Sequence, residues 1–181
     1  MVTRLLPFVM LIVLSVLYAC SDSPSPKHSG SHVPISTAPL DPAYLAGLSE
    51  GIDFVTPGYP TFVAETQGIS GNEPWGRWTA GDKAIIKFKD PLPRAFYLEL
   101  IVKWAFGPNA KSPIKIRVGA NEQTFTVTQD NEIFRFEFLI DQNVNTIEII
   151  PPKPTSPKSM KKNNDDRLLG VGLVKLRIIQ K

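Results

Sequence analysis

The sequence predicts an all-β domain over residues 41–181, a jelly-roll-like sandwich of two sheets. After residue 50, short runs of β-branched and aromatic residues recur, and Gly, Pro, Asn and Asp separate them. Within the longer runs apolar and polar side chains alternate, which is the period of a strand with one buried face. No long helical period occurs in this region. Many short strands at such spacing are typical of sandwiches and jelly rolls.

The first expected element is a short helix, because Asp41 suits the N-cap, Pro42 suits the first turn, and Gly47 suits the end. The expected strands follow at residues 82–90, 95–106, 112–120, 123–128, 132–138, 145–150 and 172–179. In residues 95–106 the apolar side chains at even positions, from Phe96 to Trp104, are expected on one buried face. The same alternation is expected for Phe134, Phe136 and Phe138.

The first nineteen residues read as an export signal. Arg4 precedes an apolar run over residues 5–16, and the segment closes with Leu17, Tyr18, Ala19 and Cys20. This ending resembles the lipobox of bacterial lipoproteins, in which the signal is cut before a lipid-modified cysteine. A single membrane-spanning anchor is the alternative, but residues 5–19 are shorter than the roughly 20 apolar residues that a spanning helix needs.

Cys20 is therefore the expected lipidation site, and its acyl chains would anchor the protein to the bacterial envelope membrane. Ser21 follows it, so the retention pattern of enteric bacteria, an aspartate directly after the cysteine, is absent. This favours the outer membrane, with the domain facing the periplasm. Residues 20–40 are rich in Ser and Pro and are expected to form a disordered tether with a reach of up to about 60 Å.

Catalysis, metal binding and nucleic-acid binding are all disfavoured. Both histidines, His28 and His32, lie in the tether, where two flexible ligands make at best a weak metal site, and no metal or other cofactor is predicted. Removing Arg4 with the signal leaves 19 of the 20 Lys and Arg against 17 Asp and Glu, a balance too even for a nucleic-acid partner. Because the only histidines lie in the tether and the only cysteine is the expected lipid anchor, the Ser-His-Asp and Cys-His arrangements are excluded, and we predict no enzyme activity.

One enzymatic alternative stays open. Glu73 paired with Asp165 or Asp166 would supply the two carboxyl groups, about 5 to 10 Å apart, that a glycoside hydrolase uses. A sequence carries no information on that distance. The alternative interpretation is that Asp165 and Asp166 lie in a solvent-exposed turn, where Arg167 neutralises their charges.

The segment GNEPWGRWTAGD, residues 71–82, concentrates large recognition side chains between glycines. Tryptophan faces stack on sugar rings while Arg and Glu bind hydroxyl groups, so Glu73, Trp75 and Arg77 are candidate glycan-binding residues. In an extended segment Trp75 and Arg77 share one face, and Trp78 takes the other face and enters the core. The alternative is that both tryptophans close the end of the sandwich and that Arg77 is a buried strut paired with Glu73 or Asp166.

Five ordered blocks, GIDFVTPGYP, GISGNEPWGRW, AFGPNAKSPIKIRVG, PPKPTSP and DDRLLGVGLVKLRI, carry a family resemblance. Together they resemble the uncharacterised C-terminal accessory domain of phosphoglycerol transferase I-type proteins, over about residues 51–179. Those transferases carry a separate metal-dependent catalytic domain, to which nothing here corresponds. The resemblance implies a stand-alone accessory domain that holds or positions a glycan beside an enzyme that modifies periplasmic glucans.

On this resemblance we extend the candidate site to Asn109, Asp166 and Arg167, whose loops would have to converge with Glu73, Trp75 and Arg77 at one end of the sandwich. The alternative for each block is turn chemistry, in which Pro and Asn set backbone angles. For the whole domain, the alternative to glycan binding is a module that docks on an envelope protein. An aromatic floor with a polar rim favours sugar, and a broad apolar patch favours a protein.

Overall fold

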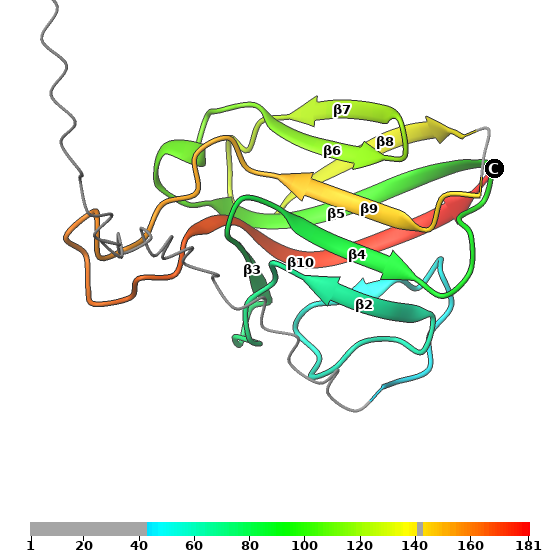
Figure 1. Cartoon of the computed structure of the whole chain (residues 1–181), viewed down its shortest axis with the longest axis horizontal. Helices are drawn as coiled ribbons and strands as arrows, with labels where there is room; N and C mark the ends of the chain where they lie inside the picture. Colours follow the sequence, from blue (N-terminus) through cyan, green and yellow to red (C-terminus); the bar gives the residue numbers. More distant parts are fainter. Residues whose placement is uncertain (1–42, 141–142) are drawn as a thin grey trace, which may run out of the picture. The chain divides into compact units, whose positions relative to one another are not determined.

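The computed structural model describes residues 43–140 and 143–181, and these form two antiparallel β-sheets packed face to face (Figure 1). The predicted signal over residues 1–19, Cys20, the predicted tether over residues 20–40, and both Asp41 and Pro42 lie outside the described residues. In the described part of the chain, no helix is long and apolar enough to cross a membrane.

The described residues form ten strands and one short 3-10 helix. Their bounds are β1 Ile52–Asp53, β2 Val63–Gln67, β3 Arg77–Ala80, β4 Ala84–Phe88, β5 Ala95–Ala105, η1 Gly107–Asn109, β6 Ile114–Val118, β7 Asn121–Phe125, β8 Glu132–Leu139, β9 Thr146–Ile150 and β10 Leu169–Gln180. The first sheet has the order β1-β10-β5-β8, and β3 also pairs with β10. The second sheet has the order β2-β4-β9-β6-β7.

The strand order confirms the predicted jelly-roll-like sandwich. From β4 onward the chain passes back and forth between the sheets: β4 lies in the second sheet, β5 in the first, β6 and β7 in the second, β8 in the first, β9 in the second and β10 in the first. This alternation of layers is typical of jelly rolls. All seven strands expected from the alternation are present, whereas β1, β2 and β3 are additional.

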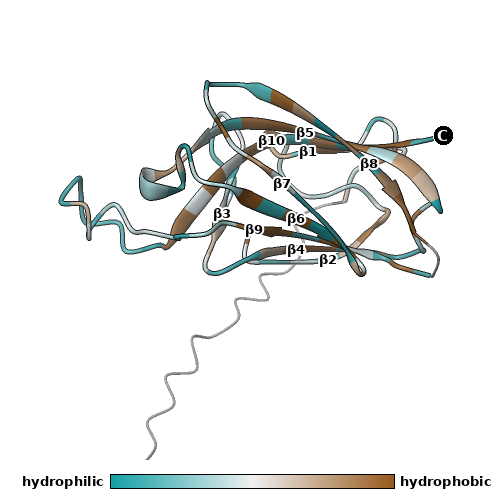
Figure 2. Cartoon of the chain, turned by 90° about the horizontal axis from the view of Figure 1, so that it is seen from above, coloured by the Kyte–Doolittle hydropathy of each residue, from teal (hydrophilic) through white to brown (hydrophobic). Residues whose placement is uncertain are grey.

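The core lies between the inner faces of the two sheets, which Figure 2 shows as two layers. Phe96, Leu98, Ile116 and Ile149 have at most 1% of their surface exposed, and the residues between them along each strand are more exposed. Full burial of one such side chain stabilises the fold by about 1.5–3 kcal/mol. The apolar residues of each alternating run therefore form the core, and the polar residues between them form the surface.

The helix expected at residues 41–47 is wrong for the residues that the structure describes. Tyr44 instead forms a parallel bridge with Pro60, and its backbone N–H donates to the carbonyl of Tyr59 at 3.1 Å. The Tyr44 carbonyl accepts from the N–H of Thr61 at 2.9 Å, and its hydroxyl accepts from the N–H of Asp53 at 2.9 Å. Tertiary partners thus take the backbone groups that a helix would use.

The expected place of Trp104 is also wrong. Along the pairing of β5 with β10, Val102 lies opposite Leu173 and Ala105 lies opposite Val171. The strand β5 therefore holds one residue more than β10 in this interval, which is a β-bulge. The extra residue removes Trp104 from the face that carries Val102 and turns it to the outer face of the first sheet, among the other tryptophans.

Candidate functional site

All three tryptophans of the chain meet on the outer face of the first sheet. Together with Phe106 they form what we call the aromatic cluster: Trp75, Trp78, Trp104 and Phe106. The ring centroids of Trp75 and Trp104 are 4.7 Å apart and tilted by 39°. Trp78 meets Trp75 edge to face at 5.1 Å, Trp104 at 5.3 Å and Phe106 at 5.7 Å. Trp78 is therefore the centre of the cluster, and the other three rings cover it.

Trp78 is buried, as expected, with 5% of its surface exposed, but not between the sheets. It lies opposite Gly172 of β10, and the next residue of β10, Leu173, points into the core. Paired residues share a face and neighbouring residues point to opposite faces. Trp78 therefore points outward, and the half-buried rings of Trp75, Trp104 and Phe106 shield it from water.

A tight turn positions Trp75. Glu73 and Gly76 exchange backbone hydrogen bonds at 2.8 and 3.0 Å, which places Pro74 and Trp75 at the two central positions. Proline is favoured at the first central position because its φ is already restricted. Gly76 has a φ of 145°, and a Cβ there would overlap the carbonyl oxygen of Leu173. The sequence predicts that Trp75 and Arg77 share one face. This prediction is wrong, because the turn interrupts the alternation between them.

A polar rim borders the indole of Trp75. Its Nε1 donates to Oε2 of Glu73 at 3.1 Å, and the other oxygen of Glu73 lies 3.4 Å from the guanidinium of Arg167. Arg167 also bonds Oδ2 of Asp165 at 2.7 Å. We call Glu73, Asp165 and Arg167 the polar rim. The structure thus brings together three of the predicted residues, Glu73, Trp75 and Arg167, although 94 positions separate Glu73 from Arg167.

Charge pairing shifts the titration of the rim. The hydrogen bond from Arg167 holds the pKa of Asp165 below its usual value, and the same contact raises the pKa of Arg167. Asp165 makes these contacts instead of the predicted Asp166, which is exposed. Arg167 binds the residue two positions before it because the Asp165 carboxylate also accepts the backbone N–H of Arg167 at 3.0 Å.

Two lysines adjoin the aromatic cluster, and sequence reasoning missed both. The Nζ of Lys103 lies 5.4 Å from the ring centroid of Trp104, and the Nζ of Lys162 lies 5.1 Å from that of Phe106. Both distances suit a cation–π interaction. Trp104 and Phe106 were also missed, because their neighbours in space come from β3 and from the loop before β10.

Asn109 is a structural residue, so we remove it from the candidate site. It is fully buried, its Nδ2 donates to the carbonyls of Phe106 and Lys153 at 2.9 Å each, and its Oδ1 accepts the N–H of Lys153 at 2.9 Å. Both ends of the amide are thus bound inside the protein. The alternative interpretation, turn chemistry, accounts for this residue, which joins η1 to the segment PPKPTSP.

Arg77 is buried beneath the loop of residues 54–59, with 5% of its surface exposed. Its Nη2 donates to the carbonyls of Thr56 and Gly58 at 3.5 and 3.4 Å, and its guanidinium lies 4.7 Å from the ring centroid of Tyr59. It is a buried strut, as the alternative interpretation holds, but it contacts carbonyls and an aromatic ring instead of the carboxylates expected from the sequence. We therefore remove Arg77 from the candidate site as well.

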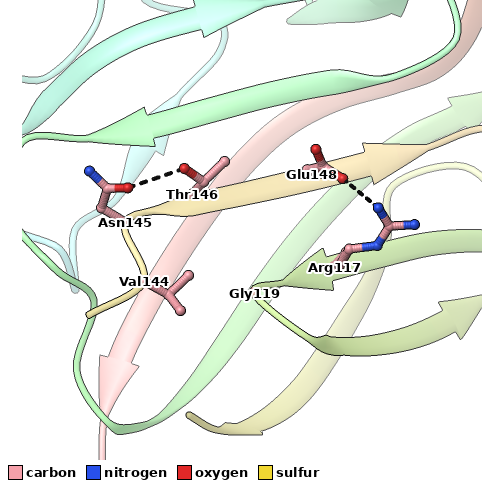
Figure 3. A pocket seen from close by; sticks show the side chains of 6 residues that line it. All are labelled: Arg117, Gly119, Val144, Asn145, Thr146 and Glu148. Carbon is pink, nitrogen blue, oxygen red and sulfur yellow. Dashed lines mark hydrogen bonds and ion pairs between the residues drawn. The ribbon is translucent and has the colours of Figure 1, made fainter. Parts of the chain in front are cut away.

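A separate hollow of about 360 Å³ lies on the second sheet (Figure 3). It is lined by Arg117, Gly119, Val144, Asn145, Thr146 and Glu148. Arg117 bonds Glu148 at 2.9 Å across β6 and β9, and Lys83 bonds the other oxygen of Glu148 at 2.6 Å. These charges are paired with one another and the lining residues include no aromatic ring, so the aromatic cluster is the better candidate site.

At the polar rim, the two carboxylates of the glycosidase alternative, Glu73 and Asp165, share one arginine. A glycosidase needs a general acid whose pKa is raised, and the pKa of Asp165 is lowered by Arg167. Arg167 lies between the two carboxylates and contacts both. Within residues 43–140 and 143–181, no group of three or more His, Cys, Asp or Glu side chains is placed to hold a metal ion.

The fold and the site define a β-sandwich module that carries an aromatic cluster and a polar rim on the outer face of one sheet. The chain belongs to the family described as a domain of unknown function, DUF7024, whose model matches residues 41–180. It is 38% identical over 130 residues to phosphoglycerol transferase I of Salmonella choleraesuis (strain SC-B67). The same identity and length hold for phosphoglycerol transferase I of Salmonella newport (strain SL254) and of Salmonella typhi.

Each match covers 70% of this chain but 17% of the relative, so the chain spans about a sixth of the length of these curated relatives. The expected relation to an accessory domain of phosphoglycerol transferase I-type proteins is confirmed. No solved structure matches the chain.

Proposed function

We propose that the domain is a glycan-binding or glycan-positioning module of the bacterial envelope, without catalysis of its own. The observation that carries this proposal is the half-buried pair Trp75 and Trp104, with Glu73 and Arg167 at its border. Sugar rings present C–H faces that pack on indoles, and their hydroxyls bind carboxylate and guanidinium groups. The site offers both kinds of contact side by side.

The relatives supply the biological setting of the proposal. They are named phosphoglycerol transferase I, and this chain matches a small part of them. We propose that the domain holds the glycan on which such a transferase acts. In the same proposal, lipid on Cys20 and the tether over residues 20–40 hold the domain at the outer membrane, facing the periplasm.

The alternative, docking on an envelope protein, draws less support from the surface. The largest exposed apolar side chains of the first sheet are Ile133 and Leu139 on β8, with 60% and 70% of their surface exposed. Arg135 and Glu137 stand between them on the same face of the strand. Charged residues therefore divide the apolar surface of β8, where a protein interface would need a continuous patch.

Titration calorimetry of the full chain with a panel of envelope glycans, including periplasmic β-glucans, tests the proposal. Trp75→Ala and Trp104→Ala should each weaken binding about tenfold or more, as truncated aromatic anchors do. Tyr97→Ala is the matched control, because Tyr97 is a half-buried aromatic residue on the same strand as Trp104, where it contacts Arg135 and Lys181. A folded wild-type protein that binds no glycan would contradict the proposal and favour the protein partner.

A further inference from the structure

We infer that the glycan bound at the aromatic cluster is anionic, and that Lys103 and Lys162 recognise its phosphate or carboxylate groups. This inference rests on the proposed function, because it names the class of ligand for the same site. It comes from the charges around the four rings.

Lys103 lies within the aromatic cluster. A Cβ built on Gly172 would be 3.4 Å from the Cβ of Lys103 and 2.9 Å from the ring of Trp75. Lys103 and Trp75 therefore lie over the same point of β10. The Nζ of Lys103 is 5.4 Å from the ring centroid of Trp104. The stem of the lysine thus runs along apolar surface, while its ammonium group lies over the ring of Trp104. No carboxylate of the described residues forms an ion pair with Lys103.

Lys162 supplies a second positive charge, at the Phe106 end of the cluster. Its backbone N–H donates to the carbonyl of Pro157 at 2.9 Å, which fixes this part of the loop, and its Nζ lies 5.1 Å from the ring centroid of Phe106. Like Lys103, it forms no ion pair with any residue that the structure describes.

The balance of charge at the site is positive. The groups that contact the rings or the polar rim are three cations, Lys103, Lys162 and Arg167, against two carboxylates, Glu73 and Asp165. Arg167 contacts both carboxylates, whereas neither lysine forms an ion pair within the described residues.

The second sheet has the same balance on its ladder, three cations against two carboxylates, but pairs the charges differently. Its outer face carries a ladder in which Glu148 pairs with Lys83 and Arg117, and Glu122 pairs with Lys115 and Arg117. Every cation of that ladder has a carboxylate partner. The lysines of the aromatic cluster are left for a ligand, and an anionic group would gain charge-assisted hydrogen bonds from them.

A comparison of three probes by titration calorimetry tests the inference: a neutral β-linked gluco-oligosaccharide, the same oligosaccharide with phosphate esters, and an oligosaccharide of uronic acid. In about 0.05 M salt we expect one or both anionic probes to bind about three- to tenfold more tightly than the neutral probe. In about 0.5 M salt screening should remove most of this preference. The anionic probe that binds more tightly identifies phosphate or carboxylate as the recognised group.

The double variant Lys103→Gln, Lys162→Gln should bind all three probes with equal affinity, because it keeps the rings and the polar rim. Lys87→Gln is the matched control, since Lys87 is an exposed lysine of β4 in the second sheet, and it should leave the preference unchanged.

The outcomes separate this inference from the proposed function. Equal binding of the neutral and anionic probes by the wild type would overturn the inference and leave glycan binding intact. A folded wild type that binds none of the probes would overturn both. Anion binding that survives Trp75→Ala and is lost in the lysine variant would also overturn the inference, because the charge would then be recognised without the sugar.

Discussion

Gly172 of β10 lies directly against the indole of Trp75. A Cβ at position 172 would be 2.9 Å from Cζ3 and 3.1 Å from Cη2 of that ring, and 3.4 Å from the Cβ of Lys103. The ring therefore packs directly on the backbone of β10. Only glycine at position 172 leaves room for it. This contact sets the height of Trp75 above the sheet and, with it, the surface offered to a ligand.

The first prediction concerns this contact. Gly172→Ala should displace the ring of Trp75, change the near-ultraviolet circular dichroism, and lower the free energy of unfolding by about 1–3 kcal/mol through overpacking. Glycan affinity should fall in parallel. Gly71→Ala is the matched control, because a Cβ at Gly71 meets nothing within 4 Å. A Gly172→Ala protein with wild-type dichroism and affinity would show that the ring position is unimportant.

Trp78→Ala should lower the free energy of unfolding by about 3–5 kcal/mol, since it removes a buried ring from beneath three others. Trp75→Ala should have a smaller effect because the Trp75 ring is only half-buried. Urea denaturation of both variants measures the difference. Equal losses of stability would mean that Trp75 supports the fold as much as Trp78 does.

Asn109→Ala should destabilise the domain without altering the site. The substitution removes the donor to the Lys153 carbonyl and the acceptor of the Lys153 N–H, whereas the Phe106 carbonyl keeps the backbone N–H of Asn109. Each lost partner costs about 1–3 kcal/mol. Glycan affinity of the folded fraction should be unchanged. Asn121→Ala, at an exposed asparagine, serves as the control in thermal denaturation. A stable Asn109→Ala variant that no longer binds glycan would restore Asn109 to the binding site.

Arg77→Ala and Arg167→Ala should have opposite effects, because one arginine is buried and the other borders the site. Loss of Arg77 should lower the free energy of unfolding by about 1–3 kcal/mol, since it removes the contacts to the 54–59 loop. Loss of Arg167 should reduce glycan affinity and leave the melting temperature almost unchanged, as is usual for exposed ion pairs. The reverse pattern would exchange the roles assigned to the two residues.

The pairing of Asp165 with Arg167 predicts a dependence on pH. The pKa of Asp165 is lowered in the folded protein, so the ion pair contributes its stability above the ordinary aspartate pKa of about 3.9 and loses it as the pH falls through the lowered value. Melting temperatures of the wild type and Asp165→Asn should differ by a constant amount from pH 7 to about pH 4 and should converge in stronger acid. A difference that persists in strong acid would exclude this ion pair as its source. The effect should be small, because the site is exposed to solvent.

Alternation along the chain is enough to predict seven strands, because the period of two is a local property of extended backbone. The strands β1 and β2 escape this reasoning: β1 has only two residues, and β2, with the sequence VAETQ, is half-buried along most of its length at the edge of its sheet. The helix expected before Gly47 fails for a related reason. Cap and turn residues state a local preference, and the bridge from Tyr44 to Pro60 overrides it.

The candidate site divides in the same way. Glu73 and Trp75 are recognisable because large polar and aromatic side chains gather between glycines, and the family blocks point to Arg167. Trp104 and Lys103 are not recognisable, since a bulge defined only by the pairing of β5 with β10 turns Trp104 outward. Asn109 illustrates the converse error, because a polar residue between two strands is easily taken for a ligand-binding residue until its burial is known.

The sequence by itself determined the all-β class, most of the strands and the family relation, because these follow from local patterns and ordered blocks. The export signal over residues 1–19 stays a prediction. The tertiary structure decided which side chains meet: three tryptophans on one face, Glu73 beside Arg167, and Arg77 and Asn109 inside the protein. The physical reason is that side chains alternate regularly in direction along a strand only as far as the next turn or bulge. Beyond that point their direction depends on hydrogen-bond partners that lie tens of residues away.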